Sequence, residues 1–303
     1  MKNIYVIGSS NTDMVVQCDH IPAPGETILG GKFVQVHGGK GANQAVSAAR
    51  LGGKVTFFCR VGKDPLGLAS IAAYQKEGIN TAYIVEDDAE QSGVALILVD
   101  REGENCIAVA PGVNAHMKPE DIAVLEKRLQ PGDVILLQLE IPMDVVEYAA
   151  RVGSRKKAII ILDPAPAPQE GLPDTIYQHL DYITPNETEA EMLAGCQDSS
   201  EHIIRELLRR GTQNVIITQS KNGCLLANSS ESKSFPPYQV NAIDSTAAGD
   251  AFAGGLAVAL AEGKAMADAI AWAQAAAALS VTKMGAQPSL PMREEVETFL
   301  SRG

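Results

Sequence analysis

The chain has 303 residues, of which 46% are hydrophobic, so it is long enough to bury a full core. Its formal net charge of −12 argues against nucleic acid or an anionic membrane surface as a partner, because neither would be attracted at long range. No apolar stretch reaches membrane-spanning length, and the N-terminus enters a strand pattern directly, so we expect a cytoplasmic protein.

The first apolar run, from Ile4 to Ile7, ends at Gly8 and has the pattern of a buried parallel strand. No G-x-G-x-x-G follows it, so a dinucleotide site of the Rossmann type is not supported. Asn11 and Asp13 come shortly after this strand, where they can point polar groups into the crevice at the carboxyl edge of a sheet. A strand-end turn capped by the same two side chains explains them equally well.

Two insertions, at about residues 13–37 and 92–110, contain short strands separated by turns rich in Pro and Gly. This pattern is more typical of antiparallel pairs than of βαβ units. We predict that the two insertions form a small antiparallel sheet that projects from the main body. Such a sheet would serve as a lid, or as a dimer surface through its exposed face and edges.

A glycine-rich segment, Gly-Gly-Lys-Gly-Ala-Asn-Gln-Ala at 38–45, runs into a helical pattern. Its glycines, Gly39 among them, let the backbone approach a ligand closely, and Lys40 and Asn43 fall three apart on the first turn of the helix. The segment is not a P-loop. We predict that Asn43 and the glycine amides recognise hydroxyl groups. A glycine-rich helix entry with a solvated Lys40 is the alternative.

From residue 55 onward, strands and helices alternate at the spacing of βαβ units. This order predicts a doubly wound, mostly parallel sheet covered by helices on both faces. The predicted strands are 55–61, 134–139, 158–162, 182–183 and 215–218; the predicted helices are 66–76, 143–151, a segment after 185, 202–210 and most of 248–302.

Polar residues gather where the predicted strands end, at Glu140, Asp163, Asn186 and Thr218. The carboxyl ends of parallel strands open onto one edge, so these residues are expected to share a site. Asn186 and Glu189, three residues apart, suit contact with a hydrated magnesium ion on ATP phosphates. The same spacing matches a helix capping box, and the two explanations carry equal weight.

Small residues at 247–249 come directly before the apolar run 251–261, which has the composition of a helix. A helix N-terminus offers unpaired N–H donors and the positive end of a dipole, so a phosphoryl group can bind there without Arg or Lys. Asp250 lies at the mouth of this cradle, where a carboxylate can accept a proton from an attacking hydroxyl. A helix N-terminal carboxylate beside packing glycines is the alternative.

In order and spacing, these segments resemble the PfkB/ribokinase family of carbohydrate kinases over essentially the whole chain. The resemblance rests on 11–13, 38–45, 185–189, 244–250 and 282–289. It implies one α/β domain over 1–303 with a small antiparallel β lid, and a homodimer formed through that lid. It also implies ATP-dependent phosphorylation of D-ribose at the 5-hydroxyl. A kinase for deoxyribose or fructose, and a non-catalytic sensor of sugar or nucleotide, remain as alternatives.

The family resemblance also implies roles for single residues. Asp250 would be the catalytic base, with the amides of Ala247, Ala248 and Gly249 as the anion hole. The sugar would be held by Asn11, Asp13, Gly39, Lys40, Asn43, Glu140 and Asp250. Mg²⁺ and ATP would be organised by Asn186 and Glu189, with Thr218, Ser220, Gly223, Gly249 and Gln274 beside the nucleotide. An activating K⁺ ion would lie near Asp244, Thr246, Ser280, Lys283, Gly285 and Ser289.

The chain departs from the family pattern at two places that face the predicted cleft. Asp163 stands where the family usually has Asn, so an extra carboxylate can alter sugar preference or metal handling. Gln219 and Ser220 stand where many relatives have Leu and Gly, which places a bulkier residue in a turn that faces the nucleotide.

Overall fold

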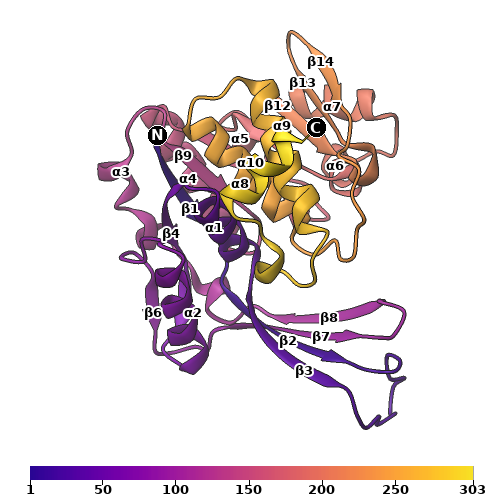
Figure 1. Cartoon of the computed structure of the whole chain (residues 1–303). Coiled ribbons are helices and arrows are strands. Elements are labelled where there is room, and N and C mark those ends of the chain that lie inside the picture. Colours follow the sequence, from indigo (N-terminus) through magenta and orange to yellow (C-terminus); the bar gives the residue numbers. More distant parts are fainter. Residues whose placement is uncertain (303) are drawn as a thin grey trace.

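The computed structural model describes residues 1–302. An eight-stranded sheet forms the centre of the main body, in the order β14-β13-β12-β11-β10-β9-β1-β4 (Figure 1). Pairing is parallel from β4 to β12, and the last two strands are antiparallel. The predicted mostly parallel sheet is therefore confirmed. Its strands are β1 (Asn3–Ile7), β4 (Lys54–Phe58), β9 (Val134–Leu137), β10 (Ile159–Leu162), β11 (Tyr182–Ile183), β12 (Asn214–Thr218), β13 (Cys224–Asn228) and β14 (Ser232–Phe235).

Helices cover both faces of this sheet, as the βαβ spacing predicts. One face packs against α1 (Lys40–Arg50), α2 (Pro65–Lys76), α8 (Ala248–Ala261), α9 (Met266–Ser280) and α10 (Arg293–Ser301). The other packs against α3 (Leu125–Arg128), α4 (Met143–Lys156), α5 (Asp174–Tyr177), α6 (Glu187–Ala194) and α7 (Ser200–Arg209). Of these helices, none is long and apolar enough to cross a membrane within residues 1–302.

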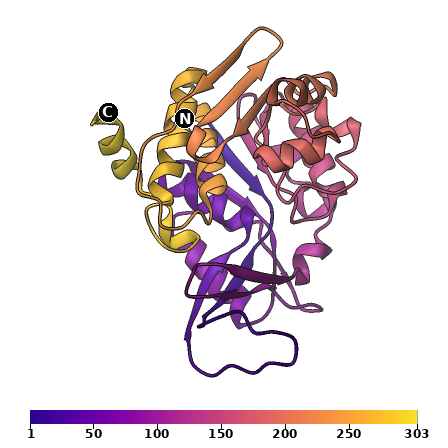
Figure 2. The same cartoon turned by 90° about the vertical axis from the view of Figure 1, so that its right-hand side faces the viewer.

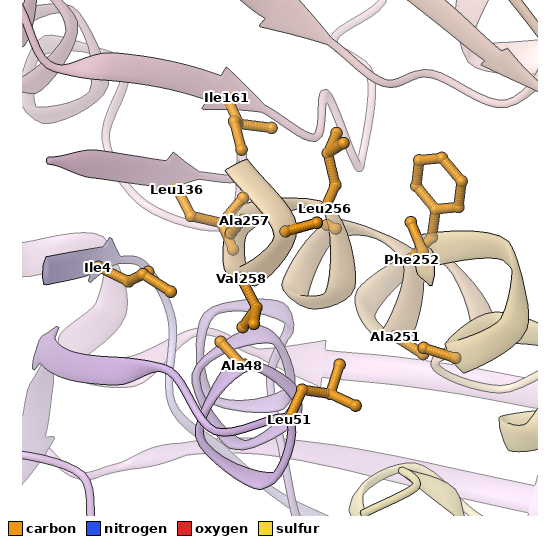
Figure 3. Close-up of a cluster of buried hydrophobic side chains, with 14 of the residues drawn as sticks. Ile4, Ala48, Leu51, Leu136, Ile161, Ala251, Phe252, Leu256, Ala257 and Val258 are labelled. Carbon is orange, nitrogen blue, oxygen red and sulfur yellow. The ribbon is translucent and has the colours of Figure 1, made fainter. Parts of the chain in front are cut away.

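Alternation along the strands divides the apolar side chains between two cores. Ile4 and Val6 of β1 belong to the core under α1 and α8, whereas Tyr5 and Ile7 belong to the core under α4. Because both faces are buried, the strand sequence is a continuous apolar run. Figure 3 shows the first core, where the labelled side chains of three neighbouring strands meet those of two helices: Ile4, Leu136 and Ile161 opposite Ala257 and Val258, with Ala48 and Leu51 beyond them.

Helices α1 and α8 pack closely against each other, and this contact positions the site. A Cβ atom at Gly254 of α8 would lie only 2.6 Å from the Cβ atom of Ser47 on α1. Ser47 also donates a hydrogen bond to the backbone carbonyl of Ala251 (3.4 Å). The absence of a side chain at residue 254 therefore lets the two helix starts meet at one end of the sheet.

A second, four-stranded sheet projects from the main body in the order β3-β2-β7-β8 (Figure 1). It consists of β2 (Asn11–Gln17), β3 (Lys32–Gly38), β7 (Gly93–Val99) and β8 (Asn105–Ala110). The outer pairings are antiparallel as predicted, but the central β2–β7 pairing is parallel. The chain passes through α1, β4 and α2 between these two strands, and such a long crossover permits parallel pairing. Figure 2 shows the segment between β2 and β3 as a long loop at the free end of this sheet.

Several element boundaries differ from the sequence prediction. The strand predicted at 55–61 is interrupted at Cys59; β4 ends before it, and β5 (Arg60–Gly62) pairs instead with β6 (Val85–Asp87) in a separate parallel pair. The β13–β14 hairpin was not predicted, because its strands carry mostly polar residues after Ala227. The segment 248–302 is helical except at 262–265, between α8 and α9, and around 281–292, which includes the short 3₁₀ turn at Gln287–Ser289.

Candidate active site

Asp250 lies in the first turn of α8 and is only 5% exposed. Its two carboxylate oxygens are held by adjacent side chains of α1. Asn43 Nδ2 donates to Oδ2 (2.9 Å) and Gln44 Nε2 donates to Oδ1 (3.0 Å). Burial raises the pKa of Asp250, although the nearby Lys40 ammonium and these two hydrogen bonds act in the opposite direction. The result is a fixed, buried carboxylate whose proton affinity is higher than usual, as a general base requires.

The start of α8 supplies backbone donors beside this carboxylate. Ala247 adopts a left-handed conformation (φ 60°) and serves as the N-cap. The Ala248 amide donates to the carbonyl of Ser245 (3.2 Å), so it is already engaged. Within residues 1–302, the amides of Gly249 and Asp250 have no intrahelical acceptor. In this conformation the amides of Gly249 and Asp250 are therefore free donors, whereas that of Ala248 is engaged; an anion hole at 247–250 stays a prediction.

Asn11 is the first residue of β2 and is buried beside the glycine turn that precedes α1. Its Oδ1 accepts a hydrogen bond from Asn114 Nδ2 (2.7 Å), which fixes the side-chain amide. Gly39 has φ +87°, and a Cβ atom there would lie 2.8 Å from the backbone nitrogen of Asn11. The strand position of Asn11 and Asp13 shows that the alternative of a capped strand-end turn is wrong.

Acidic side chains surround Lys40, which lies in the first turn of α1. Glu140 Oε2 accepts hydrogen bonds from the Lys40 amide (2.9 Å) and from Ser9 Oγ (2.5 Å). Burial raises the pKa of Asp13 to about 6, and the nearby Glu140 and Asp250 add to the effect. Burial would lower the pKa of Lys40, but the surrounding carboxylates outweigh it and raise that pKa. The lysine is therefore a charged group inside the site, rather than the solvated surface side chain of the alternative interpretation.

A cleft of about 190 Å³ connects this group to the ends of the later strands. It brings together the predicted base, the start of α8 and the polar residues after β10, β11 and β12. Its lining consists of Lys40, Asp163, Ala165, Thr184, Asn186, Glu189, Thr218, Ser245, Ala247, Ala248, Gly249, Asp250 and Phe252. Sequence positions more than 200 residues apart thus meet at one edge of the sheet.

Asn186 and Glu189 form a capping box at the start of α6. Asn186 Oδ1 accepts from the Glu189 amide, and Glu189 Oε2 accepts from the Asn186 amide (both 2.9 Å). The capping box that the spacing also predicted is therefore formed, and Asn186 is the N-cap residue before α6 instead of a residue on its face. Both residues still line the cleft, as does Thr218, whose backbone forms an isolated parallel β-bridge with that of Asn186. Their oxygens belong to the type that hydrated Mg²⁺ prefers.

Ser220, Gly223 and Gln274 lie outside the lining of this cleft. Gly223 lies in the turn after β12, where its Cα packs against the carbonyl of Phe235. Gln274 Nε2 on α9 donates to the carbonyls of Phe235 and Pro236 (both 3.4 Å). Two of the three residues predicted to face the nucleotide therefore converge on one backbone segment, beside the cleft. Their contact with a nucleotide stays a prediction.

The residues assigned to a monovalent cation fall into two groups. Asp244 Oδ1 accepts from the Thr246 amide (2.9 Å) and hydroxyl (2.6 Å), and Oδ2 accepts from the Gly285 amide (2.7 Å). Burial alone would raise the pKa of Asp244, but these hydrogen bonds outweigh it and lower that pKa. The hydroxyls of Ser280 and Ser289 donate to local carbonyls, and Lys283 forms an ion pair with Glu295. In this second group the Lys283 side chain is unsuitable as a cation ligand, whereas the serine hydroxyl oxygens and the backbone carbonyls are suitable.

Three residues of the site received no role from the sequence. Gln44 donates to Asp250 and also to Asp163 Oδ2 (2.7 Å), and Asn114 holds Asn11. Gln44 falls next to Asn43 in the glycine-rich segment, so its position was a usable signal. Asn114 lies in a 3₁₀ turn with no motif around it. Ser9 lies between β1 and β2, also outside any recognisable motif. No pattern in the chain indicates their contacts.

Comparison with known proteins agrees with this geometry. A profile for pfkB family carbohydrate kinases matches residues 1–293. The ribokinase of Haemophilus influenzae is 41% identical over 303 residues, covering 99% of this chain and 98% of that protein. The deoxyribokinase of Salmonella typhi is 36% identical, covering 99% of both. A ribokinase structure from Thermotoga maritima has a TM-score of 0.91 at 42% identity, covering 99% of this chain and 100% of that one. An Arabidopsis thaliana ribokinase structure complexed with ribose and ATP has a TM-score of 0.90 at 29% identity, covering 99% and 98%.

Proposed function

The chain belongs to the PfkB family of carbohydrate kinases, and from this premise we propose that it transfers the γ-phosphoryl group of ATP to the 5-hydroxyl of D-ribose. The observation that carries the proposal is the position of Asp250. This buried carboxylate lies at the N-terminus of α8 and faces the same cleft as the free amides there. A base and an anion site are thus adjacent, as an attacking hydroxyl and a phosphoryl group require.

In the proposed reaction, Asp250 accepts the proton of the sugar hydroxyl as its oxygen attacks the γ-phosphorus. The bond to the bridging oxygen breaks, and ADP leaves with that oxygen. The amides of Gly249 and Asp250 stabilise the transferred group, and Lys40 offsets the negative charge around it. Catalysis then consists mainly of positioning and fixed electrostatics.

Magnesium and ATP are assigned to the part of the cleft that is lined by the later strand ends. Asn186, Glu189 and Thr218 present oxygen atoms there, and hard cations such as Mg²⁺ take oxygen ligands and retain several waters. When bound, the ion would neutralise charge on the phosphates. Asn186 and Glu189 already bond to each other's amides, so contact through water is the arrangement that fits them.

Sugar recognition is assigned to Asn11, Asp13 and Asn43, together with Glu140 and Lys40. Asn43 Oδ1 is buried with no hydrogen-bond partner among residues 1–302, so it is available to a sugar hydroxyl. A ligand that lacks a matching hydroxyl leaves such a group unpaired, at about 1–3 kcal/mol. Because a deoxyribokinase relative is 36% identical to this chain, 2-deoxyribose is the second candidate substrate.

An activating K⁺ ion is assigned to the loops around Asp244 and Gly285, which are joined by a hydrogen bond next to the start of α8. The lowered pKa keeps the Asp244 carboxylate charged, which suits a cation nearby. Through these loops the ion would stabilise the amides that receive the phosphoryl group.

We also assign a homodimer to the four-stranded sheet. Phe33, Leu96, Ile107 and Val109 are each more than half exposed on it, at 59%, 56%, 52% and 53%. The strand register places Phe33 and Leu96 on one face of the sheet and Ile107 and Val109 on the other. Exposed apolar side chains on both faces of a small projecting sheet are typical of an interaction surface. The cytoplasmic location stays a prediction, which fractionation of the source cells would test.

The test of the proposed function is ADP release from Mg-ATP with ribose, 2-deoxyribose, fructose and adenosine, each with and without potassium. We expect turnover selective for ribose and stimulated by potassium, and a loss of about 10²–10⁴-fold in kcat for Asp250→Asn. If another sugar is turned over faster, that sugar replaces ribose as the proposed substrate. Binding of ribose without turnover would contradict the kinase and favour a sensor.

A further inference from the structure

Gln44 is the centre of a chain of four buried polar side chains. Its Nε2 donates to Asp250 Oδ1 (3.0 Å) and to Asp163 Oδ2 (2.7 Å). Its Oε1 accepts from Gln138 Nε2 (2.5 Å). All four residues are at most 6% exposed. The chain of hydrogen bonds therefore connects the proposed base to a second carboxylate and to the end of β9; its two glutamines are fully buried, and its two carboxylates line the cleft.

The hydrogen-bonding capacity of Gln44 fixes its orientation. A primary amide has two N–H donors, and here each one is taken by a carboxylate. A flip of the amide would place Oε1 against the Asp250 carboxylate and Nε2 against the amide nitrogen of Gln138, so these two contacts would become repulsive. Since the Gln44 and Gln138 side chains are fully buried, such a mismatch would be costly.

Asn43 and Gln44 approach Asp250 from two sides, because consecutive residues of a helix are about 100° apart. Each donates to a different carboxylate oxygen, so neither oxygen can move without breaking a hydrogen bond. A carboxylate oxygen has further acceptor capacity, and that capacity remains for the proton of the substrate.

We propose that Gln44 is a positioning residue for phosphoryl transfer: it holds Asp250 at the reacting hydroxyl, and Asp163 is the anchor that keeps the Gln44 amide in that orientation. The proposal rests on the proposed function, because it takes Asp250 as the base. It gives Asp163 a task that requires an acceptor oxygen rather than a charge.

This distinction separates two substitutions at residue 163. Asp163→Asn keeps an oxygen that can accept from Gln44 Nε2, so the orientation of the Gln44 amide is preserved. Asp163→Leu keeps a branched side chain but is larger and has no acceptor, so one amide hydrogen of Gln44 is left unpaired in a buried site. Because the added volume can also disturb packing, melting curves separate a loss of stability from a loss of kcat.

The experiment compares steady-state kinetics of Gln44→Met, Asp163→Asn and Asp163→Leu with the wild type, at several pH values and with melting curves. Gln44→Met is expected to lower kcat about 10–100-fold with the sugar KM within about threefold, since positioning of the base affects the chemical step. The acidic limb of its kcat–pH profile should move to higher pH, because the Asp250 carboxylate loses a hydrogen bond that stabilises its charged form. Asp163→Asn should retain kcat within about threefold, and Asp163→Leu should resemble Gln44→Met.

Gln75→Met on the exposed side of α2 is the matched control, and it should behave as the wild type. An unchanged kcat in a folded Gln44→Met, or equal kcat for the two variants at residue 163, would overturn the proposal. If Asp163→Leu does not fold, Asp163→Ala gives the same test, because it removes the acceptor without adding volume. Asp250→Asn separates a failure of the proposed function from a failure of this inference. If Asp250→Asn is active, Asp250 is not the base. If Asp250→Asn is inactive while Gln44→Met is fully active, only the role of Gln44 is rejected.

Discussion

Asn43 Nδ2 donates a 2.9 Å hydrogen bond to Oδ2 of Asp250, and this bond joins α1 to α8 inside the site. The oxygen of the same side chain, Asn43 Oδ1, is buried and has no hydrogen-bond partner among residues 1–302. One side chain thus holds the carboxylate with its nitrogen and has an unpaired oxygen besides. If that oxygen accepts a hydrogen bond from the sugar, as proposed, substrate recognition and base positioning are coupled at a single residue.

The double contact of Asn43 predicts that Asn43→Leu affects both kinetic constants. The sugar KM should rise because an acceptor is lost, and kcat should fall because Asp250 loses a donor. We expect a decrease in kcat/KM of about 10–100-fold, the equivalent of one or two hydrogen bonds. Asn80→Leu, at an exposed position, is the control. A change confined to kcat would show that Asn43 does not contact the sugar.

Asp13 predicts a pH limit for sugar binding. Burial, with Glu140 and Asp250 nearby, raises its pKa to about 6, so it is ionised above that pH and takes up a proton below it. An ionised carboxylate accepts hydrogen bonds from sugar hydroxyls, so kcat/KM should fall as the pH decreases through 6. Profiles of kcat/KM should lose this limb in Asp13→Asn, at the cost of weaker binding at pH 7. Retention of the limb would assign it to another group.

The turn before α1 predicts a stability and affinity effect at Gly39. Its φ of +87° disfavours other residues, and an added Cβ atom would lie 2.8 Å from the Asn11 nitrogen. Gly39→Ala should therefore lose about 1–3 kcal/mol of unfolding free energy and raise the sugar KM. Gly78→Ala is the matched control, because Gly78 also has a positive φ (+76°) but open space around its Cα. Equal KM values for the two variants would contradict a close contact at Asn11.

Asp163 predicts a pH dependence of stability. Burial raises its pKa to about 8 from an ordinary 3.8, despite the opposing Lys40 charge, and Asp250 and Glu189 add to the rise. Between these pH values the folded state retains a proton that the unfolded chain has released, so stability falls with increasing pH by up to about 1.4 kcal/mol per unit. Asp163→Asn removes this effect.

The melting temperature of Asp163→Asn should therefore exceed that of the wild type by more at pH 8 than at pH 5. Unfolding can be followed by the fluorescence of Trp272, the one tryptophan of the chain, which is buried on α9. A difference in melting temperature that does not vary with pH would show that Asp163 titrates normally.

The small sheet predicts a change of oligomeric state on mutation. If its exposed apolar residues form the dimer contact, Ile107→Asp should convert a dimer to a monomer in light scattering after gel filtration. Leu68→Asp, at a position that is similarly exposed on α2, should leave the dimer intact. A dimer that persists in Ile107→Asp would place the interface elsewhere.

The sequence predicted the architecture well where a pattern has one physical explanation. Continuous apolar runs such as Ile4–Ile7 require burial on both faces, and they identified the central strands. The interruption at Cys59 escaped prediction, because residues 55–61 contain no Gly or Pro that would mark a break, while the backbone turns from one sheet to another. Likewise, the parallel β2–β7 pairing depends on where the returning chain docks, which local sequence does not specify.

The site was predictable to the extent that its residues stand in recognisable segments. Asp250, Asn43 and Glu189 were identified in this way, and the structure brings all three to the same end of the sheet. Contacts between segments were not predictable. Nothing in the sequence indicates that Gln44 joins two carboxylates, since that contact requires the packing of α1 on α8 and β10.

That same packing of α8 on α1 places the completion of the site late in protein synthesis. Every sugar-facing residue up to Glu140 leaves the ribosome before α8 exists, and the helix that carries Asp250 begins only at Ala248. Until then, the face of α1 around Ser47 is without the helix that covers it in the folded chain. The nascent protein therefore exposes apolar surface for most of its translation, and the last fifth of the chain both covers that surface and creates a working catalyst.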